Sequence, residues 1–305
     1  MHSPPIDQEK SPDQFELDRG LQGIEALPRR AERYGKAKSI ALDVAQYICD
    51  HEQGQDLLVS RIRQCGEYLA FRHYYTVDKV RLHAGSFCEK SLLCPLCAIR
   101  RGSKALLAYL QRWEVIQLEK TALRPFLLTL TVKDGPDLAE RFKHLHDSQR
   151  ELWKRKQRGR GSVLAGVQGA VWSYEVKRGS GSGQWHPHLH AIVLAPFQPD
   201  QAELRREWLE ITGDSFMCDV RPIVGDPVEG FMEVFKYAVK FSDQPLADTW
   251  HAFQVLKGKR LLGSAGCFRG VEVPEGMLDK DEFEDLPFVE LFYRYMRGGY
   301  TLRNT

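Results

Sequence analysis

The chain has 305 residues and a mass of 35.0 kDa, which is ample for one large domain or two smaller ones with a hydrophobic core. Its 43% hydrophobic and 28% charged residues lie close to globular averages and exclude a disordered or fibrous chain. The 43 Lys and Arg nearly balance the 41 Asp and Glu, so a surface that binds anions must come from local clustering. No apolar run approaches the roughly 18 residues that span a bilayer, and no signal-type apolar core follows Met1, so we expect a cytoplasmic protein without membrane contact.

The predicted elements alternate between helices and antiparallel strands. The first part contains helical segments at 40–48 and 57–62 and then a hairpin of strands at 67–75 and 79–87. In chain order there follow a helix at 104–117, a strand at 126–132, a helix at 137–157, strands at 167–177 and 185–194 around a Gly-Ser turn, a helix at 200–211, a strand at 216–220, and helices at 228–241 and 246–256. The aromatic segment 288–295 fits either a helix or a strand. This order predicts an α+β fold, in which helices pack on a central antiparallel sheet.

Positive charge is concentrated at the end of the helix predicted at 137–157. Residues 141–160 contain eight Lys or Arg and only two acidic residues. The near-neutral total charge hides this cluster, which fits either a DNA-contacting surface or an ordinary solvated helix end.

Three cysteines stand within ten residues, at Cys88, Cys94 and Cys97. The Cys-Pro-Leu-Cys step lets two sulfurs reach one tetrahedral zinc ion, and seven cysteines in all are a poor basis for a disulfide framework. The predicted hairpin brings Cys65 back beside Cys88, which makes Cys65 the favoured fourth ligand and His83 the alternative. The remaining three cysteines, which lack such spacing, are interpreted as structural: Cys49, Cys218 and Cys267.

Three histidines alternate along one predicted strand, at His186, His188 and His190. Alternate residues of a strand share a face, so the three imidazoles are expected to converge and to form a site for a divalent metal. Pro187 favours a position near the start of the strand. Glu175, on the preceding strand of the hairpin, is a further candidate ligand.

The helix predicted at 228–241 carries Glu233, Tyr237 and Lys240 at i, i+4 and i+7, so that a carboxylate, a phenol and an ammonium share one stripe. Taken alone, this stripe fits an ordinary solvated helix face. Its combination with the histidine strand favours a catalytic role.

The strand 126–132 (FLLTLTV), the histidine strand and this tyrosine helix occur in that order behind the cysteine cluster. Together they resemble the plasmid rolling-circle replication initiators, within the superfamily of endonucleases named for a histidine-hydrophobic-histidine motif. The resemblance spans about Cys65 to Phe241 and includes Cys94–Cys97 with Arg100–Arg101. The chain departs from the family pattern at 90–93 (KSLL), where an Arg is expected shortly before the Cys-Pro-Leu-Cys step.

The resemblance implies a metal-dependent endonuclease that cleaves one strand of a plasmid origin. By this resemblance, His188 and His190, assisted by His186 or Glu175, hold Mg²⁺ or Mn²⁺, and Tyr237 attacks phosphorus to form a 5′-phosphotyrosine link with a free 3′-OH. Lys240 or Lys236 favours the phenolate, and Glu233 activates a water molecule or a second strand at termination. Zn²⁺ on the four cysteines is expected to be structural.

Composition sets apart a flexible tail (1–36), rich in Pro and polar residues, and a helical, acidic extension of unknown role (246–305). Between them, the resemblance implies a zinc-binding and DNA-contacting region (37–122) and a nicking endonuclease domain (123–245). It implies the origin DNA, host helicase, polymerase and single-strand binding protein as partners. The candidate DNA contacts are Arg100, Arg101, Trp153, Lys154, Arg155 and Lys156.

Three alternatives remain open. A relaxase or transposase of the same superfamily would use the same chemistry, although relaxases usually carry the nucleophile ahead of the histidines. A small-molecule metallohydrolase would need further His and Asp ligands downstream, where His251 is the only later histidine. A non-catalytic, zinc-stabilised DNA-binding protein would bind DNA without cleaving it.

Overall fold

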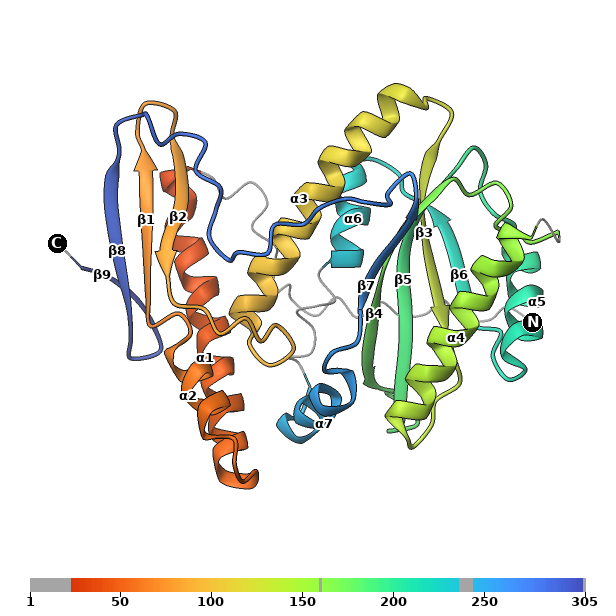
Figure 1. Ribbon diagram of the computed structural model, residues 1–305, viewed down its shortest axis with the longest axis horizontal. Coiled ribbons are helices and arrows are strands. Elements are labelled where there is room, and N and C mark those ends of the chain that lie inside the picture. The colour runs from red at the N-terminus through yellow and green to blue at the C-terminus, as the bar shows by residue number, and fades with distance from the viewer. Residues whose placement is uncertain (1–22, 159–160, 236–243, 304–305) are drawn as a thin grey trace.

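A computed structural model describes residues 23–158, 161–235 and 244–303 (Figure 1). Over these residues the fold is α+β, as predicted, with two antiparallel sheets. The four-stranded sheet has the order β2-β1-β8-β9 and the five-stranded sheet the order β6-β3-β5-β4-β7. Helix α3 (Pro95–Glu119) lies between the two sheets (Figure 1).

The four-stranded sheet joins the two ends of the described chain. The predicted hairpin is present as β1 (Tyr68–Tyr74) and β2 (Lys79–Gly85). The segment that fitted either a helix or a strand forms β8 (Val289–Met296), which pairs with β1, and β9 (Gly299–Arg303) pairs with β8. Sequence patterns did not reveal this pairing because more than 200 residues separate β1 from β8.

Helix α1 (Leu27–His51) follows a short 3-10 turn (Ile24–Ala26) and packs against α2 (Asp56–Gln64) and β9. It begins ten residues before the predicted folded region at Ala37. The polar composition of 27–36 suggested a tail, yet Arg30 and Arg33 are buried in this helix. Long cationic side chains are compatible with burial here because acidic and phenolic partners surround Arg30.

The five-stranded sheet carries helices on both faces. Its strands are β3 (Arg124–Thr131), β4 (Gly169–Arg178), β5 (Trp185–Ala195), β6 (Cys218–Pro222) and β7 (Leu262–Gly266). Helices α4 (Leu138–Gln157) and α5 (Gln201–Thr212) cover one face, while α3 and α6 (Pro227–Phe235) lie on the other (Figure 1). Helix α7 (Leu246–Leu256) contacts α1 and α4 and leads into β7. The region after residue 245 therefore contributes strands to both sheets.

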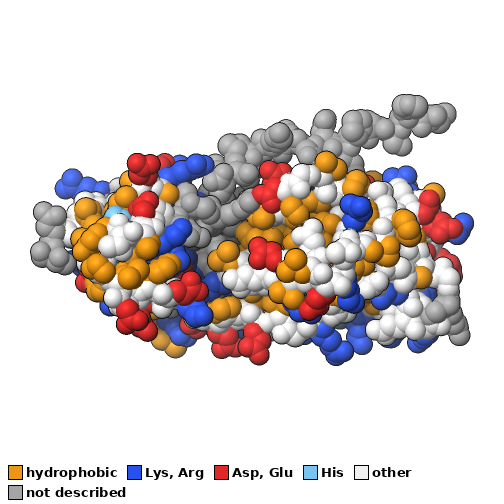
Figure 2. Space-filling model, turned by 90° about the horizontal axis from the view of Figure 1, so that it is seen from above, with side chains coloured by type: hydrophobic (Ala, Val, Ile, Leu, Met, Phe, Trp, Pro, Cys, Tyr) orange, Lys and Arg blue, Asp and Glu red, His pale blue; other side chains and the backbone are white. Residues whose placement is uncertain are grey.

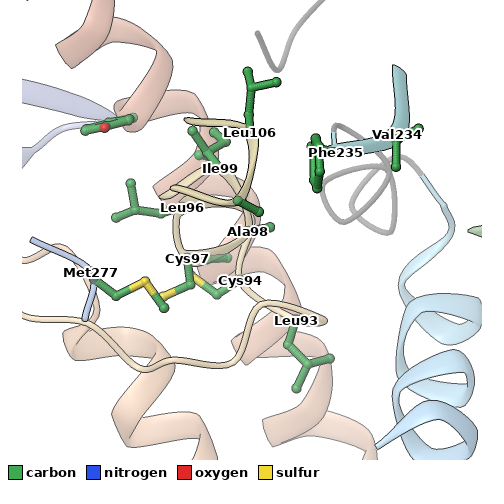
Figure 3. Close-up of a cluster of buried hydrophobic side chains, with 14 of the residues drawn as sticks. Leu93, Cys94, Leu96, Cys97, Ala98, Ile99, Leu106, Val234, Phe235 and Met277 are labelled. Atoms are coloured by element: carbon green, nitrogen blue, oxygen red, sulfur yellow. The ribbon is translucent and has the colours of Figure 1, made fainter. Parts of the chain in front are cut away.

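Two hydrophobic cores follow from this arrangement. One lies between the five-stranded sheet and α4 and α5, and includes Leu145, Leu189 and Trp208. The other continues from α1 through α3 to α6 and the opposite sheet face, and includes Tyr34, Leu106 and Phe231. Figure 3 shows part of this second core, where the start of α3 lies beside Met277 and the end of α6 presents Val234 and Phe235.

Within the described residues, no helix combines the length and apolar character required to cross a membrane. Viewed from above, acidic and basic side chains are interspersed among apolar ones over the visible surface (Figure 2). The visible face carries no dominant charge of one sign.

Candidate functional site

The histidine strand β5 forms the centre of the candidate active site. Its register sets His188 opposite Glu175 on β4 and His190 opposite Thr129 on β3. These four side chains lie on the sheet face that α6 covers, while Leu189 points into the core beneath α4. Because alternate residues of a strand point to opposite faces, the candidate ligands lie on one face of the sheet and the core residues on the other.

Glu175, His188 and His190 offer ligand atoms that all lie within 4.8 Å of one another. The Glu175 Oε2 atom is 3.0 Å from His188 Nε2 and 3.6 Å from His190 Nε2. Glu175 and His188 are buried, with 3% and 5% of their surface exposed. Two imidazoles and a carboxylate at this spacing match a divalent-metal donor set.

Hydrogen bonds orient both rings toward Glu175. His188 Nδ1 lies 3.3 Å from the backbone oxygen of His186. A carbonyl only accepts, so Nδ1 donates this bond and Nε2, on the Glu175 side of the ring, is the atom left to ligate a metal. The Thr129 hydroxyl lies 3.1 Å from His190 Nδ1 and is able to accept from it in the same way.

His186 is not part of this ligand group, although its ring centre lies 5.3 Å from that of His188. Its Nδ1 atom is 2.5 Å from Oδ1 of Asp134, in the loop that follows β3. Burial lowers the pKa of His186, and the hydrogen bond to Asp134 opposes that effect. Burial raises the pKa of Asp134, but hydrogen bonds from Ser182 and His186 outweigh it and leave that pKa below its ordinary value. Sequence reasoning missed Asp134; its only signal was its position just after a strand that pairs with β5.

Helix α6 ends beside the histidine face. The Ser173 hydroxyl donates to the Val234 backbone oxygen at 2.6 Å, and Ser173 pairs with His190 across β4 and β5. Glu233, which precedes Val234, is half-buried. The predicted nucleophile Tyr237 and Lys240 lie outside the described residues.

The four predicted zinc ligands meet at one buried point between α2, the segment after β2 and the start of α3. The sulfur of Cys65 is 3.5 Å from those of Cys94 and Cys97, and the sulfur of Cys88 is 3.6 Å from that of Cys97. A tetrahedral zinc ion with bonds of about 2.3 Å needs sulfurs about 3.8 Å apart, close to this spacing. Hydrogen bonds among the sulfurs and burial raise the pKa of Cys94 and of Cys97.

The alternative zinc ligand His83 lies elsewhere. Its Nε2 atom is 3.1 Å from Glu290 on β8. The structure therefore brings Cys65, rather than His83, to the sulfur cluster.

Arg100 is not available for DNA, which corrects its predicted role. Only 2% of its surface is exposed, and it bonds to Asp279 at 2.5 Å, to the Tyr34 hydroxyl and to the Met277 backbone oxygen. Its neighbour Arg101 is exposed. The difference arises because Arg100 faces the segment around Asp279, some 180 residues later, which no local pattern indicates.

The predicted DNA contacts on α4 differ in their exposure and in their ion pairs. Arg155 forms ion pairs with Glu151 and Glu210, at 3.9 and 3.1 Å. Lys154 is exposed, whereas Trp153 is half-buried and stacks on Trp172 of β4.

The sequence of this chain matches a known protein family. The Rep_1 family model, described as replication protein, matches residues 79–290. The chain belongs to this family of replication proteins. The matched region includes the cysteines from Cys88 onward, the histidine face and α6, so the resemblance to plasmid replication initiators is confirmed.

Three relatives, each named Protein rep, support the family membership. The protein from Streptococcus pneumoniae is 27% identical over 239 residues, which cover 71% of this chain and 72% of the relative. The protein from Lentilactobacillus hilgardii is 25% identical over 251 residues (73% and 76%), and that from Bacillus amyloliquefaciens is 24% identical over 248 residues (69% and 71%). No solved structure matches the chain significantly.

Proposed function

We propose that this replication protein initiates rolling-circle replication of a plasmid by cleaving one strand of its origin, with Tyr237 as the nucleophile. The observation that carries the proposal is the buried face on which Glu175, His188 and His190 converge beside the end of α6. The tyrosine stands three residues after Val234 in the sequence. Membership in the replication-protein family supports DNA as the substrate.

The donor set fits a divalent metal. Two neutral imidazoles and one carboxylate suit Mn²⁺ and related ions, and ordered ring orientation is typical of metal ligands. A bound cation there would supply positive charge against a scissile phosphate. The sulfur cluster fits Zn²⁺ in a closed structural site, because its four ligands are all buried.

The chain's own residues account for the cleavage step. Tyr237 Oη attacks phosphorus and forms the P–O bond, the P–O3′ bond breaks, and the departing O3′ takes up a proton to become the 3′-OH. The phenol must lose its proton, and Lys240 would favour the phenolate by placing positive charge near it. Lys177, an exposed residue on the same face of β4 as Glu175, is positioned to hold a phosphate near His186.

Glu233 is proposed to act at termination. It lies one helical turn before Tyr237 in the sequence, and a carboxylate there is suited to activate a water molecule. Hydrolysis would release the second strand without a second tyrosine. A host polymerase is a proposed partner, because a free 3′-OH is a primer that a polymerase extends. A host helicase and a single-strand binding protein are proposed from the family resemblance.

The proposal is tested by incubating the full chain with Mn²⁺ and single-stranded origin DNA and resolving the products on a denaturing gel. We expect a protein–DNA band that disappears with EDTA and in Tyr237→Phe. DNA binding without any such band, under every divalent metal tried, would instead favour a non-catalytic zinc-stabilised DNA-binding protein.

A further inference from the structure

A groove of about 410 Å³ lies on the opposite side of the five-stranded sheet from the histidines. It runs between the second half of α4 and the strands β4 and β7. Its floor contains the small residues Gly169, Ala170 and Gly266, and its walls include Trp153 and Trp172. Trp172 and Glu175 are three residues apart on β4, so their side chains lie on opposite faces. The groove is therefore separate from the proposed cleavage site.

The charge lining this groove is positive. Arg150, Lys154 and Lys156 contribute to its wall, and none of the described residues that line it is acidic. Among the described residues, no carboxylate forms an ion pair with these three cations. The other described cations of the basic segment are already paired, Arg141 with Asp214, Lys143 with Asp147, and Arg155 and Arg158 with Glu151. The unneutralised charge of this segment is thus directed to the groove.

The aromatic wall has the geometry of a stacking surface. The rings of Trp153 and Trp172 lie 5.9 Å apart at 29°, and both side chains are half-buried rather than enclosed. Gly263 on β7 leaves room for the Trp172 ring, since a Cβ atom there would come within 2.5 Å of it. Lys156 Nζ lies 6.0 Å from the centre of the Trp153 ring. The indole pair offers a surface on which a base can stack, and the cations beside it can contact the phosphates of a nucleotide.

We propose that this groove binds single-stranded DNA, with an unpaired base stacked on the Trp153–Trp172 pair and its phosphates contacted by Arg150, Lys154 and Lys156. A duplex keeps the faces of its bases inside the stack, so a stacking wall of this kind selects unpaired strands. The inference rests on the proposed function for DNA as the substrate. The groove would be a second region of DNA contact, on the opposite side of the sheet from the proposed cleavage site.

The first test uses a short labelled oligodeoxythymidine, the full chain and fluorescence anisotropy in EDTA, so that cleavage cannot contribute. Trp153→Leu should weaken binding by roughly 5- to 150-fold, the range for loss of one stacked base. Lys154→Gln with Lys156→Gln should lower the slope of log affinity against log salt by about 1.4, because each phosphate contact contributes about 0.7. Lys143→Gln, on the same helix but outside the groove, is the matched control and should leave the slope unchanged.

The second test locates the base directly. Oligodeoxythymidine carrying 5-iododeoxyuridine is cross-linked by light, and the attached peptide is identified by mass spectrometry. We expect the cross-link on Trp153 or Trp172. Cross-links found only elsewhere, an unchanged salt slope in the lysine pair, or equal competition by duplex would each overturn the inference. Trp153→Phe, which keeps a ring, controls for loss of folding and should retain most of the affinity.

Failure of the proposed cleavage chemistry is distinguishable from failure of this inference. Tyr237→Phe should bind the oligonucleotide normally in EDTA whether or not it cleaves DNA. Cleavage that persists in Tyr237→Phe would refute the nucleophile and leave the groove result standing.

Discussion

The hydroxyl of Ser173 donates a 2.6 Å hydrogen bond to the backbone oxygen of Val234 and so attaches the end of α6 to strand β4. Ser173 pairs with His190 in the sheet and lies two residues before Glu175. The bond therefore relates the helix that precedes Tyr237 to the strand that carries the candidate ligands. Stacking of Phe235 on Tyr109, with ring centres 5.3 Å apart, also links α6 to the helix that begins in the sulfur cluster.

Ser173→Ala should reduce cleavage more than it reduces stability. Loss of one hydrogen bond costs about 1 kcal/mol of unfolding free energy, whereas the end of α6 loses the bond that fixes its position beside the histidines. Covalent adduct yield and thermal unfolding, measured together, check this expectation. Ser264→Ala on the neighbouring strand β7 is the control, and equal adduct yields in the two variants would show that the bond has no positioning role.

Thr129→Val should weaken metal binding while leaving the fold intact. Valine keeps the shape but removes the hydroxyl that lies 3.1 Å from His190 Nδ1. Loss of such an orienting partner typically lowers metal affinity by roughly 10- to 100-fold. Titration of Mn²⁺ by calorimetry measures the effect. Thr131→Val is the matched control, because that hydroxyl donates to the Met217 backbone oxygen instead, and its Mn²⁺ affinity should stay near that of the unmodified protein.

Cys65→Ser should remove bound zinc and lower the unfolding temperature. The substitution takes one of four buried sulfurs from a closed site, and structural zinc contributes its binding free energy to folding. Elemental analysis and calorimetry check both outcomes. Cys49→Ser, at an exposed cysteine, and His83→Ala should keep the zinc; zinc retained in Cys65→Ser but lost in His83→Ala would reverse the ligand assignment.

Asp279→Asn should destabilise the protein by about 3 kcal/mol or more, because it leaves Arg100 buried without its carboxylate. Burial raises the pKa of Asp279, but Arg100, Arg30 and the Leu82 backbone N–H outweigh burial and hold that pKa well below its ordinary value.

A carboxyl group with a lowered pKa stabilises the fold above its unfolded-state pKa. This contribution should be lost as the pH falls from about 4 through the folded-state pKa of Asp279. Denaturant unfolding of the unmodified protein and of Asp279→Asn, measured against pH, tests the point. The difference between the two proteins should shrink in acid, and a constant difference down to low pH would contradict the ion pair.

Short-range patterns predicted much of the candidate site. Period-two spacing was sufficient to bring His188 and His190 to one face, and the predicted hairpin brought Cys65 to the other cysteines. The helix starts at Asp137 and Asp200 were also predictable, since each side chain accepts a hydrogen bond from the backbone three residues later.

Contacts between distant segments were not predictable in this way. His186 resembles its two neighbours in sequence, but its Nδ1 atom contacts Asp134 and it is not part of the ligand group. Arg100 follows the cysteines like a DNA contact, yet Asp279 holds it in the interior. In both cases the deciding partner comes from another segment, which a single sequence does not place.

The most direct test of the central claim is to isolate the covalent protein–DNA product, digest it and locate the attached nucleotide by tandem mass spectrometry. The account predicts a 5′-phosphate joined to Tyr237 and no other residue. Attachment to a different side chain, or an adduct that forms equally well in His188→Ala with metal present, would contradict it.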